Sequence, residues 1–211
     1  DELQESLDRL QTDHVDLIQV HAVNAWADLE QALAPDGAVA ALEEASRQGR
    51  VRFIGITGHA RPEILAHALR TYHFDSVLCA LGMADHLVTA PDTFLLPVAQ
   101  ERNTAVIAMK VLGHGEFPHI ARALRFSLGL PGVAVAIIGM DQRTQIDQNV
   151  EIAANFHLLS EAERQQLVDD VRPLVEKDAK ESQEGKSSLF WLHDTKVMGW
   201  VKQDEPAIVA Y

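Results

Sequence analysis

Five short apolar runs, each separated from the next by a helical stretch, most restrict what this chain can fold into. They are rich in β-branched residues and occupy residues 15–20, 51–56, 76–80, 105–109 and 133–138. Runs of this kind are typical of strands that are covered on both faces. Strands that alternate with helices at this spacing predict repeated βα units and a parallel sheet.

The segments between these runs carry helix signals. An apolar stripe at helical spacing precedes the first run, and Gly49 stands where a left-handed residue ends a helix. Pro62 fits a first helical turn, and Ser160 with Glu163 forms a capping-box pattern that opens a last helix. The stripe consists of Leu3, Leu7 and Leu10.

Two parallel architectures fit this order of elements, namely an open doubly wound sheet and a (β/α)8 barrel. No G-x-G-x-x-G motif follows an early strand, which weakens the case for an open dinucleotide-binding sheet. The barrel has a difficulty of its own, because five βα units fall short of eight and leave two bare edges. The pattern alone leaves both architectures open.

Composition narrows the class of protein and its partners. The chain has 211 residues, of which 47% are hydrophobic and 23% charged, as expected for a globular protein with one sizeable core. No apolar run approaches the roughly 18 residues that span a bilayer, so we expect no membrane partner. A net charge of −13 without a basic cluster argues against a nucleic-acid partner.

The single cysteine and the amino-terminal residues indicate in which cellular compartment we expect the protein. Cys79 lies inside an apolar run and is expected to be a buried thiol, which fits a reducing compartment. No hydrophobic leader follows Asp1. We therefore expect a cytoplasmic location.

Candidate chemistry gathers where the predicted strands end, because parallel α/β folds bind ligands at the carboxyl ends of their strands. His21 ends the first strand, although such a histidine is also common as a structural hydrogen-bonding residue. Lys110 ends an apolar strand, where a cation favours an anionic ligand or a paired carboxylate. Gly113 and Gly115 let backbone amides approach a phosphate, or simply form a turn.

The motifs support neither a metal site nor a serine or cysteine nucleophile. The ten histidines show no zinc-ligand spacing with a glutamate, so we expect no metal site. No G-x-S-x-G motif is present, and Cys79 lies inside a strand rather than at its end. A serine or cysteine nucleophile is therefore not expected.

Four ordered segments together resemble the aldo-keto reductase family. They are ESLDRLQTDHVDLIQVH at 5–21, LEEA and GRVRFIGIT between 42 and 57, VIAMKVLG at 106–113, and IIGMD at 137–141 with Gln145 and Asn149. They are similar to that family's approach to its fourth strand, its next helix and strand, its seventh strand and loop, and its cofactor-adenosine segment. The resemblance covers residues 1 to about 172.

This resemblance implies a (β/α)8 TIM barrel, represented here by about the last five βα units plus a C-terminal tail. It also implies a carbonyl reductase that uses NADP(H), with NAD(H) not excluded, on a small-molecule aldehyde or ketone. His21 matches the family's active-site histidine, which orients and polarises the carbonyl group.

Cofactor positions follow from the same resemblance. Thr57 and Gly58 fall at the positions that bond the nicotinamide carboxamide, and Met109 falls where an aromatic ring often stacks on the nicotinamide. The pyrophosphate loop matches Lys110, Leu112, Gly113 and Gly115, and the adenosine side matches Gly139, Met140, Asp141, Arg143, Gln145 and Asn149.

Two of these positions depart from the family's pattern. Gly139 and Met140 replace the Lys-Ser pair that contacts the 2′-phosphate, and Gln145 replaces an arginine. Arg143 is the substitute that this sequence offers, so NADP preference is an expectation rather than a consequence of the motif.

The family's general-acid tyrosine, its aspartate and its lysine lie on strands that would precede residue 1. This chain alone is therefore expected to be inactive, since His21 cannot replace the tyrosine as proton donor. Two alternatives remain, a non-catalytic nucleotide-binding protein and an interaction module whose open sheet is completed by a partner chain or a second copy.

The predicted domain organisation is a partial barrel over 1–173 and an extension over 174–211. Within the extension, 176–185 is polar and expected to be solvated. Two apolar segments, 188–192 and 197–201, are expected to cover the barrel, line a pocket or contact a partner.

Overall fold

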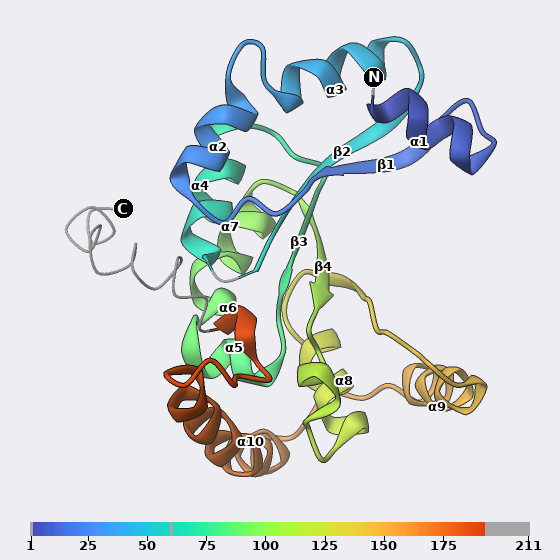
Figure 1. The fold of residues 1–211 in the computed structure, drawn as a ribbon. Helices are drawn as coiled ribbons and strands as arrows, with labels where there is room; N and C mark the ends of the chain where they lie inside the picture. Colours follow the sequence, from blue (N-terminus) through green and yellow to red (C-terminus); the bar gives the residue numbers. More distant parts are fainter. Residues whose placement is uncertain (1, 60, 193–211) are drawn as a thin grey trace.

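A five-stranded parallel sheet forms the centre of the computed structural model, which describes residues 2–59 and 61–192 (Figure 1). The strands follow one another in chain order, each pairing with the next. They are β1 Val15–Val20, β2 Val51–Gly58, β3 Ser76–Ala80, β4 Ala105–Met109 and β5 Val133–Ala136. All five predicted strands are confirmed, although β5 ends two residues earlier than expected.

Ten α-helices and two short 3₁₀ helices occur in the described ranges. The longer helices are α1 Glu2–Leu10, α2 Trp26–Leu33, α3 Ala38–Arg47, α4 Pro62–Thr71, α8 Ile120–Leu128, α9 Arg143–Ala154 and α10 Glu161–Ser182. The shorter ones are α5 Met83–Val88, α6 Pro91–Phe94, α7 Leu96–Glu101, η1 Gly113–Gly115 and η2 Phe190–Leu192. Helices α2 and α5, which are the first helices after β1 and β3, were not predicted.

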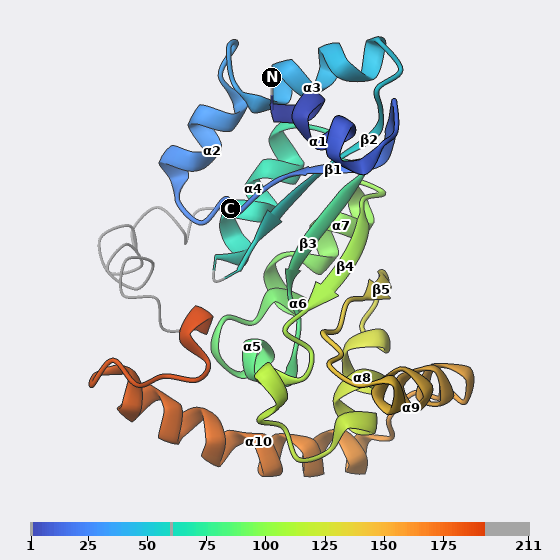
Figure 2. The same ribbon diagram turned by 45° about the vertical axis from the view of Figure 1, so that its right-hand side comes forward.

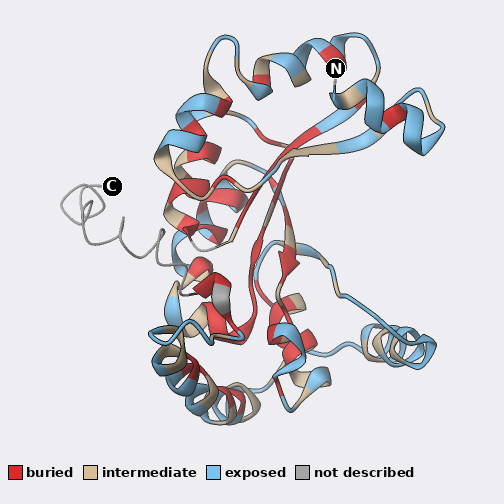
Figure 3. Ribbon diagram, viewed as in Figure 1, coloured by how far each residue is buried: buried red, intermediate tan, exposed pale blue. Residues whose placement is uncertain are grey.

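The strand register separates a buried face of the sheet from a partly uncovered one. Ile56, Val77 and Val106 form one row across β2, β3 and β4 and are fully buried. In Figure 1, α2, α4 and α7 lie on one side of the sheet, and Figure 3 shows the buried residues concentrated there. On the opposite face, the paired residues Leu17 and Phe53 are 37% and 40% exposed. The helices therefore cover one face of the sheet, and the face that a closed barrel would turn inward is partly open.

Local signals in the sequence explain several helix ends. Gly49 has φ of 74°, which confirms the predicted left-handed residue after α3. Pro62 begins α4. Ser160 Oγ accepts a hydrogen bond from the Glu163 backbone N–H at 3.3 Å, and Glu163 Oε2 accepts one from the Ser160 N–H at 2.8 Å. The predicted capping box is thus confirmed.

The carboxyl-terminal part of the described chain differs from expectation. The proposed boundary between 173 and 174 falls inside α10, which contains Pro173 and continues to Ser182. The expectation that 176–185 is solvated is wrong at Asp178, which is buried because it binds the segment that follows the helix. The apolar segment 188–192 does pack into the structure, through buried Leu189, Trp191 and Leu192. The segment 197–201 lies outside the described residues.

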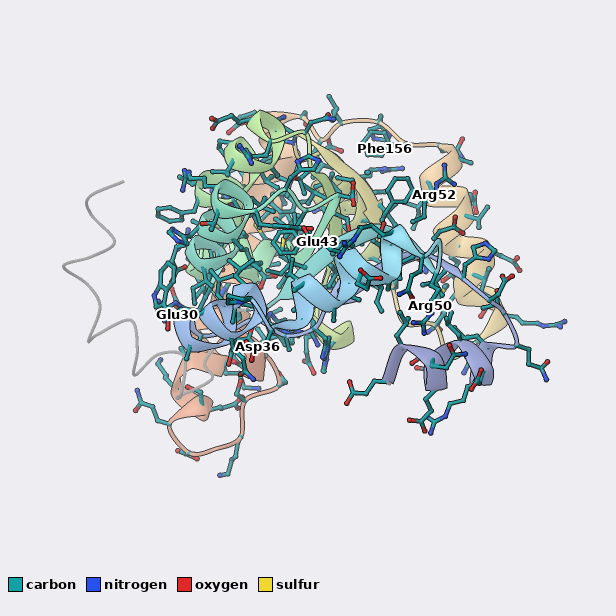
Figure 4. The ribbon with its side chains drawn as sticks, turned by 90° about the horizontal axis from the view of Figure 1, so that it is seen from above. Glu30, Asp36, Glu43, Arg50, Arg52 and Phe156 are labelled. Atoms are coloured by element: carbon teal, nitrogen blue, oxygen red, sulfur yellow. The ribbon has the colours of Figure 1, made fainter. Side chains whose placement is uncertain are left out.

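Polar contacts hold the amino-terminal end of the sheet, away from the carboxyl ends. Figure 4 shows Glu43 of α3 and Arg50 and Arg52 at the start of β2. Arg50 donates to the Gln4 side chain at 3.0 Å, and the Tyr72 hydroxyl donates to Glu43 at 3.1 Å. These contacts tie α1, α3 and the approach to β3 together.

Two further expectations concern the core and the membrane. Cys79 is buried in β3, as predicted, and burial raises the pKa of its thiol. No helix within the described ranges combines the length and apolar character that a membrane crossing requires.

Candidate functional site

His21 directly follows β1 and is exposed at the carboxyl end of the sheet. It borders a cavity of about 450 Å³, which Asp28, Gln31 and Asp36 also line. Asp28 has a structural task there, since its carboxylate accepts the backbone N–H groups of Asn24 and Ala25 at 3.1 and 2.9 Å. This cavity was not predicted, because much of its lining comes from the unpredicted helix α2 and the loop after it.

The loops after β1 and β2 are hydrogen-bonded to one another. The Ala22 backbone N–H donates to Thr57 Oγ1 at 2.8 Å, and the Val23 N–H donates to the Thr57 carbonyl oxygen at 2.8 Å. The His59 N–H donates to Asn24 Oδ1 at 2.9 Å. These three bonds fix the backbone around His21 against the end of β2.

Gly58 occupies a position with no room for a side chain. A Cβ atom built there would lie 2.7 Å from the Val23 carbonyl oxygen and 3.2 Å from the Leu65 methyl groups. The absence of a carboxamide side chain at this position is therefore built into the packing of the β1 loop. Any ligand contact at Gly58 would have to come from its backbone.

Three basic residues follow different strands at the carboxyl end of the sheet, namely His21 after β1, His59 after β2 and Lys110 after β4. His59 is half-buried after β2, and burial lowers its pKa, with further lowering by the positive charges of Lys110 and His21. The lowered pKa favours the neutral form of His59 at pH 7. The Lys110 ammonium at this end of the sheet favours an anionic group of a ligand.

Several residues of the loop after β4 have a left-handed backbone conformation. Lys110, Gly113, His114 and Gly115 have φ angles of 59°, 54°, 57° and 88°. A Cβ at Gly115 would meet nothing within 4 Å, so open space lies beside this backbone. The Gly113 and Gly115 N–H groups donate to the carbonyl oxygens of Lys110 and Leu112, each at 2.9 Å, so the loop is closed by its own backbone hydrogen bonds. The predicted loop residues Lys110, Leu112, Gly113 and Gly115 are thus brought together, next to the buried Met109.

Trp191 belongs to this end of the sheet and was not predicted as a site residue. Its ring lies 4.8 Å from Lys110 Nζ and 5.1 Å from the His114 ring. Lys110 Nζ is 3.2 Å from His114 Nε2, and burial followed by the Lys110 charge lowers the pKa of His114. The only sequence signal for Trp191 was the apolar character of segment 188–192, which did not predict where in the fold this segment lies.

The predicted adenosine-side residues lie on the segment from β5 into α9, next to β4 in the sheet order. Gln145 Oε1 accepts the backbone N–H groups of Asp141 and Gln142 at 2.7 and 3.0 Å, so it caps α9. Figure 2 shows α9 standing away from the carboxyl ends of β1 and β2. Gly139, Met140, Asp141 and Arg143 are exposed residues, and Asn149 is partly buried.

The described ranges hold no tyrosine at the carboxyl ends of the strands. Tyr72 lies before β3, at the amino-terminal end, and donates to Glu43. Burial and this hydrogen bond raise the pKa of Tyr72 to about 12, which makes it a poor proton donor near neutral pH. No group of three or more His, Cys, Asp or Glu side chains is placed to hold a metal ion in the part of the chain that the structure describes.

Comparison with known proteins agrees with this architecture. Residues 1–122 match the sequence profile described as "Aldo/keto reductase family". The L-galactose dehydrogenase of Arabidopsis thaliana is 25% identical over 82% of this chain and 63% of its own length. An uncharacterised oxidoreductase of Bacillus subtilis is 24% identical over 76% of this chain and 61% of its own length.

Solved structures show the same fold. An aldo-keto reductase of Bacillus halodurans, solved in its holo form, matches with a TM-score of 0.65 at 23% identity, over 79% of this chain and 62% of its own. The glycerol dehydrogenase of Gluconobacter oxydans matches with a TM-score of 0.62 at 18% identity, over 81% and 62%. This chain therefore spans about three fifths of the length of these relatives, and its sheet is a five-stranded part of their barrel fold. With more than half of its residues matched by the profile, the chain belongs to the aldo/keto reductase family.

Proposed function

We propose that this chain is the cofactor-binding part of an NADPH-dependent carbonyl reductase. The single observation that carries the proposal is the placement of His21, His59 and Lys110 after β1, β2 and β4, at the carboxyl edge of one parallel sheet and beside a loop of left-handed residues. The Lys110 ammonium there suits the negative charge of a dinucleotide's diphosphate. The adjoining β5–α9 segment offers Arg143 for a 2′-phosphate, with NAD(H) as the competing cofactor.

A bound nicotinamide would supply the hydride for the carbonyl carbon of an aldehyde or ketone. Lys110 would hold the diphosphate, and the open space beside Gly115 would let the diphosphate approach the loop. His21 would donate a hydrogen bond to the carbonyl oxygen and so orient it, which polarises the carbon toward attack. In its neutral form, His59 adds no further positive charge to this end of the sheet.

Completion of the reaction requires a proton for the carbonyl oxygen, and the described residues provide no suitable tyrosine. In our proposal the tyrosine, its aspartate and its lysine come from three further βα units, which would bring the five present to eight. The uncovered face of the sheet supports this proposal, because Leu17, Phe53 and Val135 on it remain 37%, 40% and 47% exposed. Eight strands would turn these side chains into the barrel interior.

Cofactor titration tests the proposal. We expect NADPH to bind the folded chain saturably and more tightly than NADH, as followed by NADPH fluorescence. Lys110→Met should weaken NADPH binding by about tenfold, since it removes a charge-assisted contact. Lys186→Met removes an exposed lysine that pairs with Glu184 and serves as the matched control. A chain that has a cooperative unfolding transition but binds neither cofactor would contradict the proposal.

A second candidate function is an interaction module of the same fold, and the exposed sheet face and free edges favour it. This hypothesis predicts that the isolated chain forms a defined dimer or binds a partner across the face that contains Phe53. Sedimentation measurements distinguish the two. A monomer that binds NADPH supports the reductase, and a stable dimer without cofactor affinity supports the module.

A further inference from the structure

The buried carboxylate of Asp178 binds the segment that follows α10. Asp178 Oδ2 accepts the Ser187 hydroxyl at 2.7 Å, and its Oδ1 accepts the backbone N–H groups of Ser188 and Leu189 at 2.8 and 3.0 Å. Burial raises the pKa of Asp178, but these hydrogen bonds outweigh it, and the pKa is lowered overall. We refer to residues 187–192 as the strap.

A second buried carboxylate holds the far end of the strap. Trp191 Nε1 donates to Asp85 Oδ1 at 2.9 Å, across 106 positions of sequence, and Asp85 Oδ2 accepts the Gly82 N–H at 2.9 Å. Asp85 and Trp191 are 1% and 3% exposed. The indole is therefore held at its edge by a hydrogen bond, and the His114 ring lies 5.1 Å from its ring.

Lys110 also lies against the Trp191 ring. Its Nζ lies 4.8 Å from the centre of the Trp191 ring, inside the range of a cation–π interaction. The Lys110 carbonyl oxygen is also close to the start of α5, since a Cβ at Gly82 would lie 2.8 Å from it. The backbone of Lys110 and its ammonium group are thus both restrained by the elements that hold Asp85 and Trp191.

We infer that Trp191 is a positioning residue, which holds the Lys110 ammonium in place at the end of β4 for a diphosphate-bearing ligand. This inference rests on the proposed function, because it assigns Lys110 to that ligand. A free lysine loses much side-chain freedom when it binds a phosphate. A lysine already held against an aromatic face loses less, so the ligand binds more tightly. Neither the strap nor Trp191 belongs to the motifs that the sequence analysis assigned to the cofactor.

The first experiment measures the position of Lys110 without any ligand. Lysines labelled with carbon-13 at the ε position give one NMR signal each, and Lys110→Arg identifies the signal of Lys110. We expect this signal to be shifted upfield by the ring current of Trp191. The shift should persist in part in Trp191→Phe, which keeps an aromatic face but lacks the Nε1–H donor, and disappear in Trp191→Leu. An unshifted Lys110 signal in the unaltered chain would overturn the inference directly.

The second experiment measures binding, with NADPH and inorganic pyrophosphate as separate probes. Trp191→Leu should raise both dissociation constants by about threefold to tenfold, and Trp191→Phe should raise them less. Trp26→Leu is the matched control, because Trp26 packs on His67 at the start of α2 and should leave both constants unchanged. Trp191→Phe retains most of the buried volume, so it keeps the test valid if Trp191→Leu unfolds.

The outcomes separate this inference from the proposed function. If the unaltered chain binds NADPH but neither Trp191 variant changes its affinity, the positioning role is wrong and the proposed function stands. If the unaltered chain binds neither probe, the proposed function fails and takes the positioning role with it. Weaker binding in Trp191→Leu together with loss of the ring-current shift supports both.

Discussion

Thr57 Oγ1 accepts the backbone N–H of Ala22 at 2.8 Å, which ties the residue after His21 to the end of the neighbouring strand. Ala22 has φ of 60°, an unusual conformation for alanine, and Thr57 is buried. The family resemblance assigned Thr57 to the nicotinamide carboxamide. Its oxygen has a structural partner in this chain, so the hydroxyl hydrogen is what remains for a ligand.

Thr57→Val should therefore destabilise the chain. Valine has nearly the same shape but leaves the Ala22 N–H without an acceptor, and we expect the free energy of unfolding to fall by about 1–3 kcal/mol. Urea denaturation measures this change. Thr57→Ser keeps the hydroxyl and is the control. Equal stability of the valine and serine variants would show that the bond to Ala22 contributes little.

The two glycines of the loop after β4 should respond differently to alanine. Gly115 has φ of 88° and open space around its Cα, so Gly115→Ala should cost about 1–2 kcal/mol from backbone strain alone. A Cβ at Gly113 would also lie 2.5 Å from Phe117 Cε1, and Gly113→Ala should cost more. Thermal unfolding of both variants provides the measurement, and a smaller loss for Gly113→Ala would contradict this account of the loop.

Asp85 should make the stability of the chain fall as the pH rises toward neutral. Burial raises the pKa of Asp85 to about 7 from an ordinary 3.8, despite hydrogen bonds from Trp191 and Gly82 that favour its charged form. Between these two pH values the folded chain holds a proton that the unfolded chain has released. The free energy of unfolding therefore decreases across this window and levels off above it.

Asp85→Asn should flatten this decrease, as measured by urea denaturation between pH 4 and pH 8. Asp92 provides a control of opposite sign. Burial raises its pKa, but His86 at 2.9 Å outweighs that effect, and the Asp92 pKa is lowered overall. Asp92→Asn should reduce the loss of stability on acidification and leave the window above pH 4 unaltered. An unchanged profile in Asp85→Asn would mean that Asp85 is ionised in the folded chain.

Replacing Lys110 should raise the pKa of His59. Burial is the largest cause of the lowered pKa of His59, and the charge of Lys110 is the next. Lys110→Met should therefore move the pKa of His59 upward without restoring its ordinary value of 6.5. NMR titration of the histidine ring protons measures this shift, with Lys186→Met as the control. A constant His59 pKa would show that the charge of Lys110 does not act on His59.

Much of the fold follows from local patterns in the sequence. The five strands, the left-handed Gly49 and the Ser160–Glu163 capping box arise from neighbouring residues alone, so the chain could be divided correctly into βα units. The pattern could not choose between an open sheet and part of a barrel. That choice depends on which face of the sheet is covered, and Phe53 and Val77 look equally apolar in sequence although their exposures are 40% and 0%.

The candidate site, too, could be predicted from the sequence only in part. Because strands in a parallel sheet all end at one edge, the order of elements by itself placed His21, Thr57 and Lys110 at a common edge. Helices α2 and α5 were missed because their lengths of 8 and 6 residues hold too little apolar periodicity. Contacts between residues far apart along the chain left no pattern in the sequence from which they could be predicted.

The sequence by itself determined the βα order, the family and the residues that follow each strand. Only the tertiary structure decided that Asp178 lies buried against the strap, that Gly58 has no room beside Val23, and that Trp191 reaches Asp85 and Lys110. The physical reason is separation along the chain. Periodicity reports the environment of residues a few positions apart, whereas a bond across 106 positions forms only when packing of the whole sheet brings its two ends together.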